Sequence, residues 1–252
     1  MSFVFPFGRP VTPRPPSSSV PRRVFILGAY PSALHIEWTP PKPYKQIRAL
    51  AVDDEPTPFW TGHDEEARVR RWAETVGFRP SWGKVRGVGR LNGSSGIWVE
   101  REVLHPLDVT HADTWITDCL DTYRASTGVG LRLSDTYEPF AREVGLPPAA
   151  LPSHPGENDI VREARSEHLG RLRRELRTCE PQLVVTLGNA ALRVVRDLVE
   201  VEAAPTRLSV TSYGTRLPCR FDGRTIAWLP LAHPAAPAAY QAAHGRWHAG
   251  PR

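Results

Sequence analysis

The sequence is poor in cysteine and in long apolar runs, and each shortage excludes a class of protein. Its three cysteines, Cys119, Cys179 and Cys219, form no CxxC pair, which excludes a zinc ribbon or a local iron–sulfur motif. A sparse, odd set of cysteines indicates a reducing compartment. No apolar run is long enough to cross a bilayer, and the start shows no signal-peptide pattern. We therefore expect a cytoplasmic protein without a membrane partner and without a metal site.

Lysine is also scarce, so the basic residues are almost all arginine. The chain has 32 Lys and Arg against 27 Asp and Glu, a net charge of +5, yet lysine occurs only at Lys42, Lys45 and Lys84. A modest positive charge suits a polyanion such as nucleic acid. A GC-rich genome that favours arginine codons explains the same excess equally well, so charge alone does not decide the function.

Length and patterning predict one α/β domain after a short tail. Residues 1–23 are rich in Pro, Ser and Arg, which predicts a flexible tail or a surface strap. The remaining chain, 24–252, has enough length and apolar content for one catalytic domain. Its alternation of apolar runs and amphipathic stretches predicts a three-layer α/β/α sandwich with a central, mostly parallel sheet.

The strands and helices follow from the spacing of apolar residues. Short apolar runs predict strands at 24–27, 47–52, 114–118, 183–187, 208–211 and 225–229. Helical spacing predicts helices at 64–76, at about 94–104, from Asn158 onward, at 190–199 and near the end of the chain.

Three of these strands end in loops suited to a ligand. The first runs into Gly28-Ala29-Tyr30-Pro31-Ser32, the second into Gly188-Asn189, and the third into His233-Pro234. Glycine permits close approach of the backbone to a ligand, and proline fixes the turn. Open α/β sheets bind ligands at the carboxyl ends of their strands, so we expect these loops to form the site.

Together these loops resemble the uracil-DNA glycosylase superfamily. The turn Gly28-Ala29-Tyr30-Pro31-Ser32 resembles its first motif, a Gly-x-x-Pro turn that positions water and phosphate. Ile116-Thr117-Asp118 is similar to the strand end that reads the edge of the base. His233-Pro234-Ala235-Ala236-Pro237 resembles the His-Pro-Ser motif, whose loop enters the duplex and carries a histidine.

Two further stretches extend the resemblance over most of the chain. Residues 49–52 resemble the segment beneath the flipped base, and 183–190 resemble a Leu-Gly-x-x-Ala strand–helix turn. The resemblance implies a monomer with a uracil-DNA glycosylase-like fold that needs no cofactor. It would flip a base from double-stranded DNA and hydrolyse its N-glycosidic bond, leaving an abasic site. It assigns the base pocket to Gly28, Ala29, Tyr30, Ser32, Val52 and Asp118, and DNA contacts to Pro31, Ser32, Gly188, Asn189, Pro234, Ala235 and Ala236.

The resemblance also implies how the bond is cleaved. Cleavage places negative charge on the departing base, and a histidine at the pocket rim stabilises that charge. His233 is the candidate, against the alternative of a loop histidine without a role. No lysine lies in the motif loops, so a Schiff-base lyase step is not expected and the enzyme would be monofunctional.

The departures from the family pattern bear on water activation and stacking. The motif aspartate that activates water is replaced by Tyr30. Asp53 is our candidate for the missing carboxylate, with Asp54 and Asp118 as alternatives; a solvated acidic turn is the other interpretation of residues 53–55. Val52 replaces the aromatic residue beneath the base, so Tyr30, Phe59 or Trp60 would supply the stacking.

Two other departures bear on the substrate. Ser32 stands where a bulky tyrosine crowds C5 of the pyrimidine, and therefore leaves room for a substituent. Asp118 replaces the asparagine that matches uracil, and a carboxylate accepts well from the N4 amine of cytosine. A protonated Asp118 would instead donate to N3.

Three functions remain open from the sequence. The leading one is a glycosylase for a C5-modified cytosine, such as glucosylated hydroxymethylcytosine of phage DNA, which would serve antiviral defence. The second is a repair glycosylase for uracil or another deaminated base. The third is a catalytically inactive DNA-binding module of the same fold. Catalytic roles are assigned to His233, Asp53 and Asp118.

Overall fold

The computed structural model describes residues 3–203 and 205–249 and divides them into two compact units. Unit 1 comprises residues 3–14, 31–97 and 122–154, and unit 2 comprises residues 15–30, 98–121 and the described residues from 155 onward. The first two residues of the predicted tail and the last three of the predicted domain lie outside the described residues. The assignment of 24–252 to one catalytic domain stays a prediction.

Unit 2 contains a five-stranded, mostly parallel sheet, which makes the protein an α/β protein. Its strands are β1 (Val24–Gly28), β5 (Thr114–Asp118), β6 (Leu183–Leu187), β7 (Leu217–Phe221) and β8 (Arg224–Leu231). They are ordered β5-β1-β6-β8-β7, and only β7 is antiparallel to its neighbour. Every residue of β1, β5 and β6 is buried, as expected for parallel strands covered on both faces.

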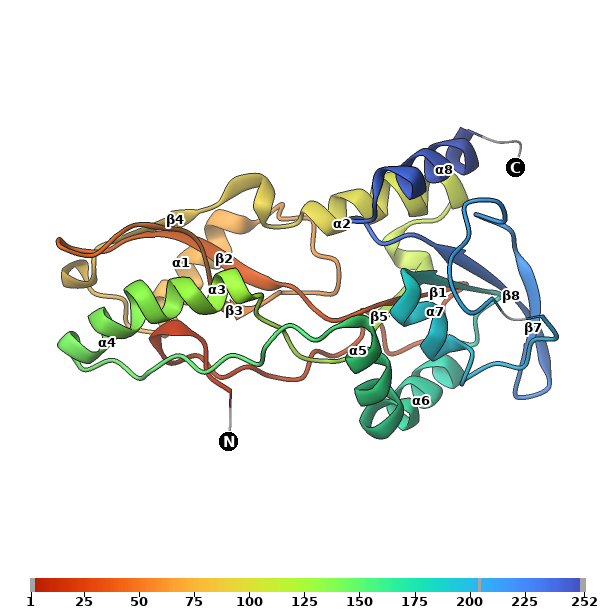
Figure 1. Ribbon diagram of the computed structural model, residues 1–252, viewed down its shortest axis with the longest axis horizontal. Helices are drawn as coiled ribbons and strands as arrows, with labels where there is room; N and C mark the ends of the chain where they lie inside the picture. The colour runs from red at the N-terminus through yellow and green to blue at the C-terminus, as the bar shows by residue number, and fades with distance from the viewer. Residues whose placement is uncertain (1–2, 204, 250–252) are drawn as a thin grey trace. The chain divides into compact units, whose positions relative to one another are not determined.

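Helices of unit 2 cover both faces of this sheet (Figure 1). One layer contains α5 (Glu157–Glu163), α6 (Leu169–Cys179) and α7 (Asn189–Val195), with a π-helical turn at Ala164–His168 between the first two. Apolar residues of these helices form one core with Phe25, Val184 and Trp228 of the sheet. Helix α8 (Ala238–Ala249) lies on the other side. This arrangement is compatible with the predicted three-layer sandwich.

Unit 1 contains a separate antiparallel sheet in the order β3-β2-β4. Its strands are β2 (Ala33–Thr39), β3 (Ile47–Asp54) and β4 (Lys84–Gly87). The predicted strand 47–52 therefore exists, but it pairs with β2. The physical reason is the short connection 40–46, since a parallel pair needs a crossover of a dozen or more residues.

Helices complete unit 1 and its aromatic core. They are α1 (Glu65–Thr75), α3 (Thr127–Arg132) and α4 (Glu138–Val144), with a π-helical turn at Leu133–Tyr137. Helix α2 (Ser94–Val99) spans the division between the units and continues into a π-helical turn at Glu100–Leu104. Short 3-10 turns occupy Pro6–Gly8, Pro80–Trp82, Gly89–Leu91, His105–Leu107 and His111–Asp113.

The N-terminal segment differs from the predicted flexible tail. Phe5 and Phe7 are buried in the core of unit 1, and the Phe7 ring packs edge-on against Trp38 and Trp72. The backbone N–H of Phe7 donates to the Tyr137 hydroxyl at 2.6 Å. Phe5 and Phe7, on either side of Pro6, give the segment a buried face. The prediction of a flexible tail rested on the overall content of Pro, Ser and Arg and did not consider these two residues.

The strand predicted at 208–211 is absent, and β7 was not predicted. The Leu208 N–H donates to Asn189 Oδ1, and the Leu208 carbonyl accepts from the Tyr240 hydroxyl. Side chains thus satisfy backbone groups that a strand would pair in a ladder. Within the described residues, no helix is both long and apolar enough to cross a membrane.

Candidate active site

Four parallel strands of unit 2 deliver their carboxyl ends to one edge of the sheet. Gly28 ends β1 and lies in register with Asp118, which ends β5. On the other side of β1, β6 ends at Leu187, and β8 beyond it ends at Leu231. With strands about 4.8 Å apart, the two outer strands of the four lie roughly 14 Å from each other.

The loops after β1 and β5 run side by side. The N–H of Cys119 donates to the Gly28 carbonyl at 3.1 Å, and that of Leu120 donates to the Ala29 carbonyl at 3.0 Å. Tyr30 is partly exposed beside them. Burial raises the pKa of the Tyr30 hydroxyl, and the Asp118 carboxylate raises it further. Tyr30 therefore stays a neutral phenol next to the predicted base-reading carboxylate.

Asp118 is 6% exposed, and its backbone is held by an arginine of α6. Arg171 Nη2 donates to the carbonyls of Asp118 (2.7 Å) and Cys119 (3.1 Å). Its Nη1 donates to Thr117 Oγ1 at 3.1 Å and to Glu175 Oε1 at 2.7 Å. One guanidinium thus fixes three consecutive residues at the end of β5. Sequence patterning did not single out Arg171, because it is one of several arginines on a helix whose polar face was expected to be solvated.

The Cys119 thiol beside Asp118 is not a nucleophile candidate. It is completely buried, and burial together with the neighbouring carboxylate raises its pKa. A thiol whose pKa is raised carries little of the thiolate that attacks. The other two cysteines are also buried.

The loops after β6 and β8 touch each other. Gly188 has a φ of +89°, and its N–H donates to the Leu231 carbonyl at 2.8 Å. A Cβ added at Gly188 would lie 3.3 Å from the Cβ of His233, so a larger residue would crowd the histidine and strain the backbone. Of the predicted DNA contacts, Gly188 and Asn189 therefore lie next to the His233-Pro234-Ala235-Ala236 loop.

The His233 side chain has a defined tautomer when it is neutral. The ring is accessible to solvent, yet desolvation by surrounding atoms lowers its pKa below the usual value of 6.5. The Ala235 N–H donates to Nδ1 at 3.2 Å. Since Nδ1 accepts, the proton of the neutral ring lies on Nε2, which leaves an N–H donor for a ligand.

The predicted pocket residues of unit 1 have other contacts within that unit. Both carboxylate oxygens of Asp53 lie 3.2 Å from Arg9 Nε, and Asp54 accepts from the backbone and hydroxyl of Thr12. These carboxylates hold the N-terminal segment. Val52 is fully buried in the core. Its place in the base pocket stays a prediction.

The remaining residues differ in exposure. Pro31 is buried and Ser32 is exposed, and both begin the second segment of unit 1, residues 31–97. Of the three aromatic residues considered for stacking, Trp60 is 3% exposed and donates to Asp64. Phe59 is also buried. Tyr30 is the one that belongs to unit 2 and follows one of its strand ends.

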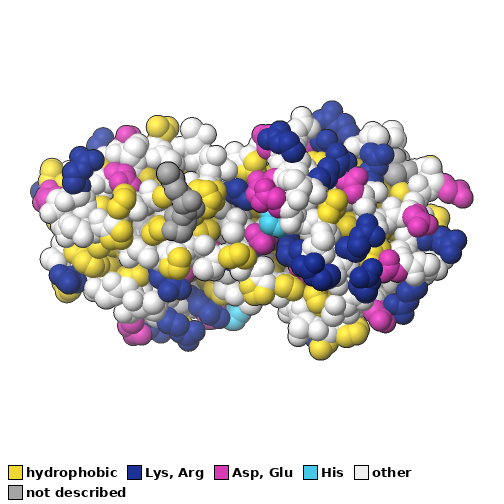
Figure 2. Space-filling view, turned by 90° about the horizontal axis from the view of Figure 1, so that it is seen from below, with side chains coloured by type: hydrophobic (Ala, Val, Ile, Leu, Met, Phe, Trp, Pro, Cys, Tyr) yellow, Lys and Arg dark blue, Asp and Glu magenta, His cyan; other side chains and the backbone are white. Residues whose placement is uncertain are grey.

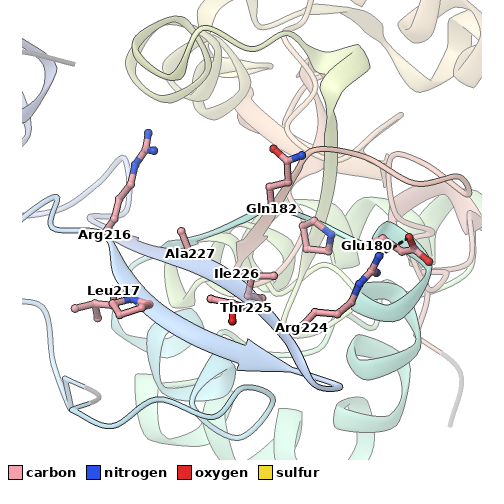
Figure 3. A pocket seen from close by; sticks show the side chains of 10 residues that line it. Glu180, Gln182, Arg216, Leu217, Arg224, Thr225, Ile226 and Ala227 are labelled. Carbon is pink, nitrogen blue, oxygen red and sulfur yellow. Dashed lines mark hydrogen bonds and ion pairs between the residues drawn. The ribbon is translucent and has the colours of Figure 1, made fainter.

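A cavity of about 610 Å³ lies at the opposite end of the sheet (Figure 3). Gln182 precedes β6, and Thr225 and Ala227 belong to the first half of β8. Arg224 at its wall is paired with Glu180 at 3.1 Å. None of the predicted site residues lines it. We therefore give it no role in the candidate site.

Charge on the α5–α6 face of unit 2 is mixed rather than uniformly basic. In Figure 2, Lys and Arg side chains there are interspersed with Asp and Glu side chains. Arg165 pairs with Asp197, and Arg177 pairs with Asp222. Such pairs neutralise the positive charge that a DNA backbone would need, so this face is a weak candidate for DNA binding.

One group of side chains has the ligand types of a metal site. Among the described residues, Glu163, Glu167 and His168 offer ligand atoms within 4.8 Å of one another. Such acidic groups commonly occur on surfaces without an ion, and His168 Nδ1 also approaches Asp121 at 3.7 Å. The group does not belong to the strand ends described above.

Two comparisons with known proteins were made, one with family models and one with curated proteins. No model of a protein family matches the chain, and no curated protein matches it significantly.

Proposed function

We propose that the protein is a DNA glycosylase of the uracil-DNA glycosylase type that acts on a C5-modified cytosine. The observation that carries the proposal is the meeting of four strand ends in unit 2. They bring the Gly28-Ala29-Tyr30 turn, Asp118, the Gly188-Asn189 turn and His233 to the same edge of a parallel sheet. The sequence resemblance assigns base binding to the first two of these elements, DNA contact to the third and a catalytic role to His233.

His233 would stabilise the departing base. In the reaction, the C1′–N bond of the flipped nucleotide breaks and water adds its oxygen to C1′. The base leaves with the bonding electron pair and is then protonated, and the DNA keeps an abasic site. The Nε2–H of neutral His233 can donate a hydrogen bond to the carbonyl oxygen on which this negative charge develops.

Asp118 would select cytosine. Its carboxylate accepts from the exocyclic N4 amine, a group that uracil lacks. Arg171 fixes the backbone of this residue, which places the acceptor in a defined position. Tyr30, partly exposed beside it, would provide a stacking surface. The C5 substituent is proposed from the sequence resemblance alone, in which Ser32 replaces a bulky tyrosine.

A test of His233 in this role compares two histidine variants. The substrate is phage DNA that contains glucosylated hydroxymethylcytosine, and abasic sites are counted as alkali-labile breaks. We expect His233→Ala to reduce their formation by about 10²- to 10³-fold, the range for loss of one donor to a developing anion. His111→Ala, at an exposed position of the same unit, should leave it unchanged. Equal rates in both variants would contradict the assignment.

A DNA-binding module without activity is favoured by a different observation. Asp53, the candidate for activating water, is engaged by Arg9 in unit 1. If no other carboxylate replaces it, the protein would bind DNA in a salt-dependent manner and release no base from any substrate. The remaining candidate, a repair glycosylase for uracil, predicts that Asp118→Asn keeps activity on uracil.

A further inference from the structure

A chain of hydrogen bonds connects the residue before His233 to helix α8 and to the π-helical turn at Glu100–Leu104. The backbone N–H of Ala232, the residue before His233, donates to the Tyr213 hydroxyl at 2.8 Å. The Tyr213 oxygen lies 2.7 Å from His244 Nδ1, and His244 Nε2 lies 2.9 Å from the Glu102 carbonyl oxygen. We call Tyr213, His244 and the Glu102 carbonyl the brace.

Every proton of the brace has a defined place when His244 is neutral. A carbonyl oxygen only accepts, so His244 Nε2 carries the proton and donates to Glu102. Nδ1 is then an acceptor, and the Tyr213 hydroxyl donates to it. The same hydroxyl oxygen accepts from Ala232. The direction of each bond thus follows from the carbonyl at one end and the amide at the other.

Burial keeps the brace uncharged. His244 is 4% exposed and lies between the rings of Trp98 and Trp247, at centroid distances of 4.9 and 5.1 Å. Burial lowers the pKa of His244 and raises the pKa of Tyr213 to about 12. Gly214, next to Tyr213, has no room for a Cβ against Trp247. The brace is therefore a packed element and not an exposed contact.

We propose that Tyr213 and His244 are positioning residues that hold His233 at the end of β8 for the reaction. The inference rests on the proposed function and extends it to residues that do not reach the base. Without the Tyr213 hydroxyl, the Ala232 N–H loses its partner, and the adjacent His233 gains freedom. Misplacement of a catalytic group by about 1 Å costs on the order of 10²-fold in rate.

The first test is kinetic and uses Tyr213→Phe, with Tyr240→Phe as the matched control. Both substitutions remove a phenol hydroxyl of unit 2, but the Tyr240 hydroxyl donates to the Leu208 carbonyl. We expect Tyr213→Phe to lower kcat roughly 10- to 100-fold with KM nearly unchanged, and Tyr240→Phe to change neither. His244→Gln, whose amide can donate to Glu102 and accept from Tyr213, should keep more activity than His244→Leu.

The second test asks whether Tyr213 acts through His233. In a His233→Ala background, Tyr213→Phe should cause no further loss, because the group that it positions is gone. A loss of the same size in both backgrounds would show a general structural role and overturn the proposal.

The third measurement does not depend on activity. The His233 ring is titrated by NMR and assigned with His233→Ala. Tyr213→Phe should shift its pKa toward 6.5, while Tyr240→Phe leaves it in place. An unchanged titration in Tyr213→Phe would overturn the proposal even if the wild type releases bases. If Tyr213→Phe shifts the pKa of His233 but the wild type releases no base, the proposed function is contradicted. The positioning of His233 by Tyr213 would then still hold.

Discussion

At the scale of the residue, the contacts of His233 favour its neutral form. Its Nδ1 accepts from the Ala235 N–H, and desolvation disfavours the charged ring. A proton on Nδ1 would face the Ala235 N–H and break this bond. On the proposed function, the neutral ring with its donor at Nε2 is the form that we expect to be active.

This assignment predicts the acid limb of the pH profile. We expect kcat to be constant above pH 6.5 and to fall about tenfold per pH unit below the pKa of His233, which lies under 6.5. The measurement is the single-turnover rate of base release as a function of pH, with DNA saturating. A rate that rises toward low pH would identify the charged imidazolium as the active form and contradict this account.

Asp118 carries the prediction on base identity. Asp118→Asn replaces one carboxylate oxygen by an NH₂ group. An NH₂ group directed at the N4 amine of cytosine would place two donors against each other. We expect a loss of about 1–3 kcal/mol in transition-state stabilisation on modified cytosine, the range for one base-edge contact. Comparison of kcat/KM on modified cytosine and on uracil measures it. Retained activity on modified cytosine would remove the carboxylate from base reading.

At the scale of the element, the end of β5 is fixed by a side chain from α6. Arg171 is 19% exposed and bonds to three backbone or hydroxyl oxygens of residues 117–119. Hydrogen bonds to a charged, largely buried donor contribute more than neutral ones. Removal of the guanidinium leaves these oxygens without their donor.

Arg171→Met should therefore lower the free energy of unfolding by about 2–3 kcal/mol. Arg173→Met, on the same helix but at an exposed position, should change it by less than about 0.5 kcal/mol. Urea denaturation of the two variants, with comparison of their m-values, gives both numbers. Equal stability would mean that water or neighbouring groups replace Arg171 at the end of β5.

Strand β2 gives unit 1 a predicted sensitivity to acid. Burial lowers the pKa of His35 to about 4. Above pH 6.5 the ring is neutral in both the folded and the unfolded state, so it has no effect on stability. Between pH 6.5 and 4 the unfolded state binds a proton that the folded state excludes. As the pH is lowered through this range, the free energy of unfolding therefore decreases by about 3 kcal/mol in total.

His35→Gln removes this titration and provides the measurement. Urea denaturation at several pH values between 4 and 7 should give a smaller slope of stability against pH for the variant than for the wild type. The comparison uses slopes because the substitution itself also changes stability. Parallel curves would show that His35 is protonated in the folded state.

At the scale of the whole molecule, the sequence predicted the buried parallel strands best. The stretches at 24–27, 114–118 and 183–187 are strands in the structure, and all of their residues, including the polar ones, are buried. The helices expected from 64 and from 158 onward were also found. The division into two units was not predicted, since it depends on long-range contacts that join residues 31–97 to 122–154.

The sequence indicated those candidate-site residues that are glycine, aspartate or histidine at or near a strand end. It did not indicate the others. Gly28 and Asp118 end buried strands, Gly188 directly follows one, and His233 lies two residues after the end of β8; the sheet brings these strand ends to one edge. Arg171, Tyr213 and His244 have hydrogen-bond partners that lie 19 to 142 positions away in the chain. No local pattern indicates such partners. Asp53 stays a prediction because its observed partner is Arg9.

The central claim is release of a modified cytosine, and mass spectrometry of free bases tests it most directly. The purified chain is incubated with uracil-containing DNA, unmodified DNA and phage DNA that contains glucosylated hydroxymethylcytosine, with His233→Ala beside it. We predict the free modified base and matching abasic sites from the phage DNA alone, and little or none with His233→Ala. Release of uracil alone would assign the protein to repair, and release from none of the three would contradict the glycosylase account.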